Sequence, residues 1–396
     1  MSVREHVRTQ RRRLVELVAL LAIGALWVAM IVVGVGFALA QVYDGRTVAA
    51  VGLTGGGLGL VCVGALLVWA HFTGNGRVAH TDTSGHGGRE VSVVSRDGTR
   101  LHVEVDGPDD AEVTVVFVHG WTCQLSAWRH QRRHLAGRPV RSVYYDQRGH
   151  GRSDWIGMGE GERGVRHLAD DLDAVVAATA PTGRLVLVGH SMGGMTIMAS
   201  AQRHPEVVAS RVDGVLFCGT AAGPLSESMA LGLPESMRPL HHLVRRHAVS
   251  MLTLLGFMPR PMARLLGVGP YLFFGNLLAV GSRSESAKQV TAQGLWDTPL
   301  PVAGRMLKAV MTHDERDAVP SLDPTRVVVV SGKADRLVPY ADQLELARLV
   351  GDARVVGLEG IGHMVAQEAP DVVNAELDGV LALAGVQGDH EASVLA

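Results

Sequence analysis

A serine between two glycines is the first feature of this sequence that could carry chemistry. Residues 189–193 are Gly-His-Ser-Met-Gly, directly after the apolar segment 185–188 and directly before a helical pattern. A Gly-x-Ser-x-Gly turn between a strand and a helix holds the serine in strained backbone angles and lifts its hydroxyl clear of the sheet. Side chains at Gly189 and Gly193 would collide with this turn. We therefore predict that Ser191 is a nucleophile supported by the two glycines.

A serine nucleophile needs a general base, and the base needs a carboxylate that orients it. His363 follows the apolar segment 353–358, and Asp335 follows the apolar segment 327–330. If these segments are parallel strands, both residues lie at the carboxyl ends of strands, where open α/β sheets carry their sites. The sequence thus predicts a Ser-His-Asp triad made by Ser191, Asp335 and His363.

A tetrahedral intermediate at such a serine carries a negative oxygen, which two preorganised N–H groups must stabilise. The residue after the nucleophile, Met192, is expected to supply one backbone N–H. A His-Gly-Trp turn directly follows the apolar segment 113–118, and we expect the backbone N–H of Trp121 to supply the other. His119 and Gly120 are predicted to support the geometry of this turn rather than to transfer a proton.

Other candidate residues are weaker. Asp314 and Asp317 are alternative acids, but they precede the strand segment and are badly placed. Cys123 lies close to the oxyanion turn and could be modified, although a small buried residue is its commoner role. The sequence has no zinc-type spacing of His and Cys, and the glycine-rich residues 52–59 lie inside an apolar span rather than after a strand. We therefore expect neither a metal nor a cofactor.

These residues need a framework of strands and helices to position them. Asp97-Gly98 separates two short segments and predicts a hairpin. Apolar segments then alternate with helical patterns, which is typical of an α/β fold with a mostly parallel sheet. The expected strands are residues 90–95, 101–106, 113–118, 142–145, 185–188, 212–217, 327–330 and 353–358, and the expected helices are residues 126–135, 165–178, 192–203, 341–350 and 371–383.

The motifs and their order resemble those of the cap-containing α/β-hydrolases, a group of esterases, monoacylglycerol-type lipases, cofactor-free haloperoxidases and epoxide hydrolases. The chain order serine, aspartate, histidine is the α/β-hydrolase order. The resemblance implies an α/β-hydrolase fold, with a mostly parallel eight-stranded sheet and a helical cap inserted over the site. The matching stretches are residues 117–121, 146–154, 189–194, 332–335 and 362–363.

The resemblance also implies a class of activity. Members of the group that act on epoxides or haloalkanes carry aspartate at the nucleophile position, whereas this chain has Ser191. The predicted activity is therefore hydrolysis of carboxylic esters through an acyl-enzyme. Acyl transfer and haloperoxidase-like perhydrolysis would use the same triad, and a non-catalytic hydrolase-like binding protein is a further alternative. Asp146 and His150 lie in a turn that is structural in the family.

Residues 222–312 occupy the place where the family inserts its cap. Prolines interrupt this segment, so we predict several short helices. Its apolar stretches and its basic patch at residues 241–247 could contact anionic lipid headgroups, although packing of a cap on its core explains them more simply. The hydrolase core is accordingly divided into a first part, residues 76–221, and a second part, residues 313–396.

Two apolar segments near the N-terminus predict a membrane anchor. Residues 17–40 and 48–70 contain no charged residue, and each exceeds the ~20 residues that cross a bilayer. Arginines flank both outer ends, so a transmembrane hairpin within residues 1–75 would leave both chain ends in the cytoplasm. The alternatives are a signal peptide cleaved after residues 38–40 and two apolar helices in a water-soluble core.

The overall composition excludes several classes of protein. The 396 residues are 47% hydrophobic and carry a net charge of −2, so neither a disordered chain nor a nucleic-acid binder is expected. Three cysteines cannot build a disulfide scaffold. The predicted partners are the lipid bilayer and an apolar ester or lipid substrate, and the catalytic domain is predicted to be cytoplasmic. No oligomeric state is predicted.

Overall fold

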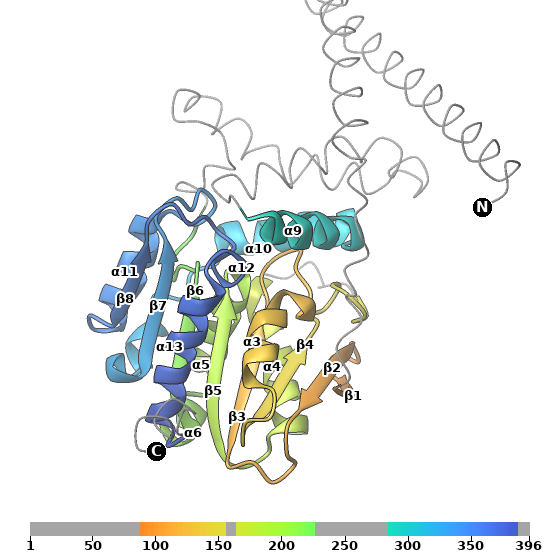
Figure 1. The fold of residues 1–396 in the computed structure, drawn as a ribbon. Coiled ribbons are helices and arrows are strands. Elements are labelled where there is room, and N and C mark those ends of the chain that lie inside the picture. Colours follow the sequence, from red (N-terminus) through yellow and green to blue (C-terminus); the bar gives the residue numbers. More distant parts are fainter. Residues whose placement is uncertain (1–87, 156–163, 226–283, 387–396) are drawn as a thin grey trace, which may run out of the picture. The chain divides into compact units, whose positions relative to one another are not determined.

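One eight-stranded sheet organises the residues that the computed structural model describes, which are 88–155, 164–225 and 284–386. The strand order is β1-β2-β4-β3-β5-β6-β7-β8 (Figure 1). β2 pairs antiparallel with β1 and β4, and all other neighbours pair in parallel. This confirms the predicted α/β fold with a mostly parallel sheet. The strands are β1 (Arg89–Val94), β2 (Arg100–Asp106), β3 (Val113–Val118), β4 (Arg141–Tyr145), β5 (Arg184–His190), β6 (Val212–Cys218), β7 (Val327–Gly332) and β8 (Arg354–Leu358).

Helices cover both faces of the sheet. Alternate strand residues point to the same face, and Val115, Phe117 and Val188 belong to one hydrophobic core with residues of α3 and α13. On the other face α4 and α5 pack on each other, and α5 packs on β5 (Figure 1). The helices are η1 (Leu125–Trp128), α3 (Arg129–Leu135), α4 (Gly164–Thr179), α5 (Met192–Arg203), α6 (Pro205–Arg211), α9 (Glu285–Asp297), α10 (Leu300–Thr312), η3 (Val319–Ser321), η4 (Pro324–Arg326), α11 (Tyr340–Val350), α12 (Val365–Glu368) and α13 (Pro370–Leu383).

The strand that leads to Ser191 is longer than the apolar segment 185–188 predicts. β5 continues through Gly189 and His190, which pair with the last two residues of β6. Glycine and histidine carry no apolar strand pattern, but the parallel ladder extends over them because β6 runs alongside. The extension brings the chain directly to the turn at Ser191.

Some short helices differ from the prediction. The helix expected over residues 126–135 starts with the 3-10 turn η1, in which Ala127 N–H donates to Gln124 O at 2.9 Å, and continues as α3. α6 and α12 are seven and four residues long and were not predicted. Helices of one or two turns are too short to show an amphipathic period.

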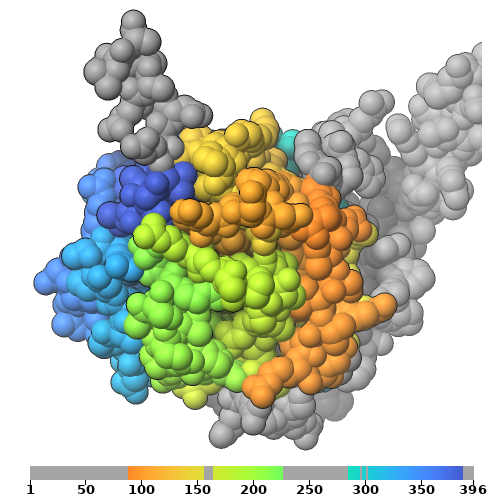
Figure 2. Space-filling model, turned by 90° about the horizontal axis from the view of Figure 1, so that it is seen from below, coloured from red at the N-terminus to blue at the C-terminus, as the bar shows by residue number. Residues whose placement is uncertain are grey.

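Two helices from the C-terminal part of the predicted cap lie at the carboxyl ends of the parallel strands (Figure 1). α9 begins after Ser284, whose hydroxyl accepts a hydrogen bond from Ala287 N–H at 3.3 Å. α10 begins after Pro299, which cannot continue a preceding helix. Seen from the opposite end of the sheet, the first strands (orange), the middle of the chain (green) and the C-terminal part (blue) adjoin one another (Figure 2).

Several predictions concern residues outside the described ranges. They are the apolar segments 17–40 and 48–70 with their basic flanks, and the cap residues 226–283, which include the basic patch at 241–247. Within the described ranges no helix is long and apolar enough to span a membrane. The two transmembrane helices therefore stay a prediction.

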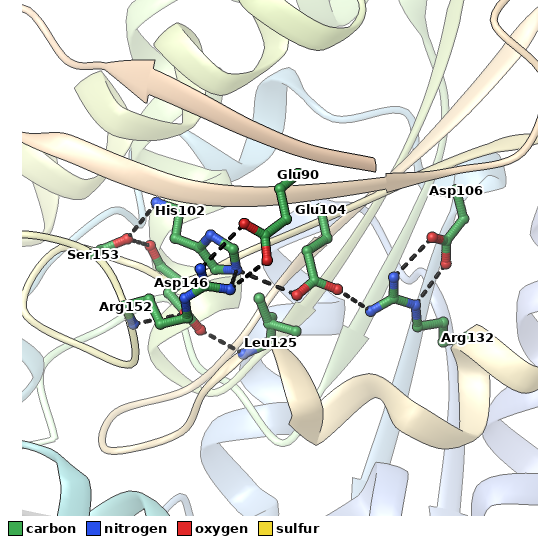
Figure 3. A network of polar contacts seen from close by, with 9 residues as sticks. All are labelled: Glu90, His102, Glu104, Asp106, Leu125, Arg132, Asp146, Arg152 and Ser153. Atoms are coloured by element: carbon green, nitrogen blue, oxygen red, sulfur yellow. Dashed lines mark hydrogen bonds and ion pairs between the residues drawn. The ribbon is translucent and has the colours of Figure 1, made fainter. Parts of the chain in front are cut away.

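A polar network holds the turn after β4 against the strands and η1 (Figure 3). Asp146 accepts hydrogen bonds from Leu125 N–H at 2.8 Å and from Arg152 N–H at 2.9 Å. Ser153 Oγ accepts from His102 N–H at 2.9 Å. Burial raises the pKa of the Asp146 carboxyl. This network agrees with a structural role for the turn, because its polar atoms are directed at backbone groups of neighbouring elements.

Candidate active site

The turn between β5 and α5 has the geometry that a nucleophilic serine requires. Ser191 has φ +51° and ψ −120°, a conformation that L residues other than glycine rarely adopt. A Cβ at Gly193 would lie 2.0 Å from Val118 O, and one at Gly189 would lie 2.7 Å from Gly194 Cα. A side chain at either position would therefore force the neighbouring backbone to move.

Asp335 and His363 meet across the ends of β7 and β8. His363 Nδ1 and Asp335 Oδ2 are 2.8 Å apart, and both side chains are buried. The other carboxylate oxygen of Asp335 accepts backbone N–H bonds from Leu337 at 2.8 Å and Val338 at 3.0 Å. These bonds fix the carboxylate and leave Nε2 as the remaining nitrogen of the imidazole. Gln343 Nε2 also donates to Asp335 Oδ2 at 3.3 Å.

Ser191 and His363 line one mainly apolar pocket. Its walls come from the oxyanion turn, the serine turn, the segment after β7, α9 and α10, so residues far apart in the sequence converge there. Ser191 itself is 5% exposed, and an apolar substrate would complete its removal from water. The pocket is lined by Trp121, Thr122, Cys123, His190, Ser191, Leu225, Thr291, Leu307, Val310, Leu337, Val338, His363 and Met364.

One of the two predicted oxyanion donors, Trp121, lines this pocket, and the other, Met192, directly follows Ser191 in the chain. Met192 is the first residue of α5, where backbone N–H groups have no partner within the helix and the helix dipole favours negative charge. Trp121 follows β3 by three residues, and its side chain lines the pocket. Among the described residues, neither backbone N–H donates a hydrogen bond. Within the described ranges no acceptor is therefore paired with either predicted donor.

Two buried histidines, His119 and His150, make hydrogen bonds to the backbone of these turns. His119 Nδ1 lies 2.8 Å from Gly120 O, and its Nε2 accepts from Gln147 N–H at 2.9 Å. His150 Nε2 accepts from the N–H of Thr122 at 3.1 Å. Burial lowers the pKa of His119 well below its usual value and that of His150 to about 4, so both rings are neutral near pH 7. The predicted supporting role of His119 fits these contacts.

His190 and Glu368 contact the loop that carries His363, and the sequence did not indicate these contacts. His190 Nε2 lies 3.0 Å from His363 O, and burial followed by the charge of His363 lowers the pKa of His190 to about 3. The carboxylate of Glu368 accepts from Gly362 N–H at 3.0 Å and from Met364 N–H at 3.1 Å. These residues hold the backbone on both sides of the imidazole. Gln343 and Glu368 belong to no motif, so only the fold reveals them.

The weaker candidates lie elsewhere or are inert. Asp314 pairs with the neighbouring Arg316 at 2.8 Å on the surface, and Asp317 is exposed. Cys123 lines the pocket, but burial raises the pKa of its thiol to about 12 and keeps it protonated. Neither Asp314 nor Asp317 contacts His363 in the described part of the chain.

One cluster away from this pocket has donor atoms close enough to be considered for a metal. Glu90, His102 and Glu104 bring donor atoms within 4.8 Å of one another. Arg152 donates to Glu90 at 2.6 Å, and Arg132 donates to Glu104 (Figure 3). The guanidinium groups already neutralise both carboxylates, so we assign no metal to this cluster.

The parallel sheet, the serine turn and the paired Asp335 and His363 define an α/β protein with a serine-centred site. Residues 115–376 match the alpha/beta hydrolase family, and the chain belongs to this family. A non-heme haloperoxidase from Rhodococcus erythropolis is 30% identical over 294 residues, which are 72% of this chain and 97% of the relative. A bifunctional esterase/perhydrolase from Acinetobacter calcoaceticus is 34% identical over 148 residues, which are 37% of this chain and 50% of the relative. An esterase from Exiguobacterium antarcticum shares the fold with a TM-score of 0.58 at 22% identity, covering 73% of this chain and 98% of that chain.

Proposed function

We propose that this chain is a serine hydrolase that cleaves carboxylic esters of apolar substrates. The observation that carries the proposal is the 2.8 Å contact between His363 Nδ1 and Asp335 Oδ2, made beside a pocket that also holds Ser191. A buried carboxylate on Nδ1 fixes the imidazole tautomer in which Nε2 can accept a proton. The positive φ of Ser191 supports its assignment as the nucleophile.

The proposed reaction has two halves. Ser191 Oγ attacks the ester carbonyl carbon while His363 Nε2 takes its proton, and Asp335 stabilises the imidazolium. The backbone N–H groups of Trp121 and Met192 stabilise the oxyanion. The C–O bond to the alcohol then breaks, the alcohol leaves with the proton from His363, and an acyl-enzyme ester remains. Water attacks this ester through the same base and releases the carboxylic acid.

The substrate class follows from the wall of the pocket. Leu225, Leu307, Val310 and Met364 offer only hydrocarbon and thioether surface, which suits an apolar acyl chain or alcohol. Among the described residues, no aspartate, glutamate, lysine or arginine lines this pocket. A lipid ester, such as a monoacylglycerol, is the proposed substrate.

Ester turnover by the full-length protein in detergent tests the proposal. Monoacylglycerols and nitrophenyl esters of increasing acyl length are compared in the wild type and in Ser191→Ala. We expect turnover that falls by at least about 10⁴-fold in Ser191→Ala, with the highest kcat/KM on long acyl chains. Equal turnover in the two proteins would reject the mechanism. Activity that peaks on short chains would retain the esterase but reject the lipid substrate.

A second activity, perhydrolysis, is favoured by the relatives, which include a non-heme haloperoxidase and a bifunctional esterase/perhydrolase. Hydrogen peroxide would replace water as the attacking group on the acyl-enzyme, so that a peroxy acid leaves and Ser191 is regenerated. We expect added peroxide to divert the acyl group from acid to peroxy acid, measured by oxidation of bromide. Unchanged yields of carboxylic acid with no bromide oxidation would leave hydrolysis as the activity.

The membrane anchor belongs to the same proposal. Residues 17–40 and 48–70 would form a transmembrane hairpin, which places the catalytic domain in the cytoplasm next to lipid substrates. Protein that stays in the membrane fraction after alkaline extraction would support the anchor, and release into the supernatant would reject it. Protection of the catalytic domain from protease added outside intact cells would support the cytoplasmic orientation.

A further inference from the structure

We infer that helices α9 and α10 position the oxyanion loop, residues 119–124, and that the indole N–H of Trp121 is the main positioning group. This inference rests on the proposed function, because it concerns the backbone N–H that would stabilise the oxyanion. It assigns the inserted helices a role in the chemical step in addition to covering the substrate. Three contacts carry it, and they involve different residues on both helices.

The first contact joins the oxyanion residue itself to α10. Trp121 Nε1 donates a hydrogen bond to Ala303 O at 2.9 Å, across 182 residues of sequence. Ala303 lies in the first turn of α10 and is buried. The hydrogen bond therefore fixes the side chain of the residue whose backbone N–H is the proposed oxyanion donor. A shift of α10 would therefore displace Trp121.

The second contact is between backbones. A Cβ at Gly294 of α9 would lie 1.7 Å from Thr122 O, so the helix and the loop touch without any side chain between them. Glycine is a poor helix former, and here it permits this close approach. Thr122 has φ +52°, a strained conformation that persists only where its surroundings hold it. The loop beside Trp121 is thus confined by α9.

The third contact lies at the far end of the loop. Gln124 Nε2 donates to Asp297 Oδ2 at 2.8 Å, next to the C-terminal end of α9. His150 Nε2 also accepts the N–H of Thr122 at 3.1 Å. The loop is therefore held both by the turn after β4 and by the two inserted helices. Its backbone N–H groups depend on both supports for their direction.

The consequence is a link between the inserted helices and the transition state. Oxyanion stabilisation depends on N–H groups that are already aligned with the developing charge, so a small rotation of the Trp121 peptide weakens it. The substrate before reaction carries a neutral carbonyl and is less sensitive to this alignment. Loosening the loop should therefore lower kcat more than it raises KM.

The test compares two tryptophans in the full-length protein, the half-buried Trp121 and the buried Trp128. Trp121→Phe removes the indole donor but keeps the backbone N–H. Trp128→Phe is the matched control, because Trp128 is 1% exposed and its Nε1 has no partner among the described residues. We expect Trp121→Phe to lower kcat about tenfold with KM within about twofold, and Trp128→Phe to keep both within about twofold. Affinity for a boronic acid, whose adduct with Ser191 carries an oxyanion, should fall by the same factor as kcat.

A glycine pair provides the second comparison, in case the tryptophan variants fold poorly. Gly294→Ala forces α9 away from Thr122, whereas Gly379→Ala on α13 adds a methyl group that meets nothing within 4 Å. Gly294→Ala should lower kcat and boronate affinity together, and Gly379→Ala should leave both unchanged. Thermal unfolding midpoints identify any variant whose loss of activity is a loss of folded protein.

The failure of this inference is distinguishable from failure of the proposed function. If the wild type shows no Ser191-dependent ester turnover, the proposed function fails, and the rate at which a phosphonate ester labels Ser191 becomes the readout. That reaction also builds negative charge on an oxygen in the oxyanion hole. If Trp121→Phe and Gly294→Ala match their controls in kcat, boronate affinity and labelling rate, the inference is wrong. A rise in KM alone would also overturn it, because it would indicate a role in substrate binding.

Discussion

The nucleophile turn and the oxyanion loop follow two paired strands, β5 and β3, yet different contacts hold them in place. The turn at Ser191 is fixed by backbone packing, because Gly193 lies too close to β3 to carry a side chain. The loop at Trp121 is held by hydrogen bonds to His150 and Ala303, which belong to other segments of the chain. A local motif can therefore specify the first geometry, whereas the second depends on the whole fold.

The difference has a physical basis. The glycine contacts at the serine turn are rigid, since a Cβ at Gly193 would meet backbone atoms of β3 and one at Gly189 would meet the backbone of α5. Side-chain hydrogen bonds across 182 residues depend on how the inserted helices are placed. The variants below change the supports of these two regions or, in one case, the acid that orients the base.

The largest expected effect belongs to the acid that orients the base. In Asp335→Asn, an amide N–H₂ group would replace Oδ2 and face the Nδ1–H of His363, so the imidazole would be held in the wrong tautomer. We expect kcat to fall by about 10⁴-fold, with a nearly unchanged unfolding midpoint. Steady-state kinetics and thermal unfolding of the same preparation measure the two quantities. A loss below tenfold would show that Asp335 is not the partner of the base.

The second prediction concerns pH, because both regions contain buried neutral histidines. Burial lowers the pKa of His119 well below its usual value, that of His150 to about 4 and that of His190 to about 3. In the unfolded chain each histidine has its usual pKa of about 6.5. Below pH 6.5 the unfolded state therefore binds protons that the folded state does not, and stability falls as the pH falls. Well above pH 6.5 the unfolded histidines are also neutral, and these groups contribute no further pH dependence.

The contribution of one histidine to this pH dependence can be measured with a single substitution. Three such groups lower the free energy of unfolding by about 4 kcal/mol per pH unit between pH 6 and pH 5. His150→Gln retains an acceptor for the N–H of Thr122 but removes one titrating group. We expect urea unfolding of this variant to show a slope smaller by about 1.4 kcal/mol per pH unit. An identical slope in the two proteins would mean that His150 titrates normally in the folded state.

The third prediction tests the rigid packing at the elbow. Gly193→Ala places a methyl carbon 2.0 Å from Val118 O, so the backbone of β3 or α5 must move. We expect a loss of about 3 kcal/mol in the free energy of unfolding, together with a lower kcat. Gly379→Ala in α13 is the matched control and should be neutral or slightly stabilising. Wild-type stability in Gly193→Ala would contradict backbone packing as the support of the turn.

The same contrast explains how far the sequence alone could go. The parallel sheet could be predicted because buried strands are short apolar runs, and the serine turn because glycine contacts leave a local pattern. Asp335 and His363 could be placed because the ends of parallel strands meet at one edge. In the structure His363 Nδ1 and Asp335 Oδ2 are 2.8 Å apart.

The supports of the site could not be predicted. Gln343 and Glu368 are ordinary helix residues whose contacts arise from the course of the chain, eight residues after Asp335 and five residues after His363 respectively. The contact between Trp121 and Ala303 requires knowledge of where α10 lies. The 3-10 turn before α3 was missed because an apolar helical pattern does not distinguish the two kinds of helix.

The smallest expected effect examines the least buried of the loop contacts. Gln124→Ala removes the hydrogen bond to Asp297 Oδ2, while Gln293→Ala removes a second bond to the same oxygen, at 2.6 Å, without touching the loop. Exposed hydrogen bonds contribute about 0.5 kcal/mol, so kcat in Gln124→Ala should fall roughly twofold and that of Gln293→Ala should not change. Stopped-flow acylation with replicate preparations resolves this difference. Equal losses of activity in the two variants would indicate that kcat depends on a fixed position of the Asp297 carboxylate rather than on its contact with the loop. If neither does, the indole of Trp121 and the backbone contact at Gly294 are sufficient to hold the oxyanion donor in place.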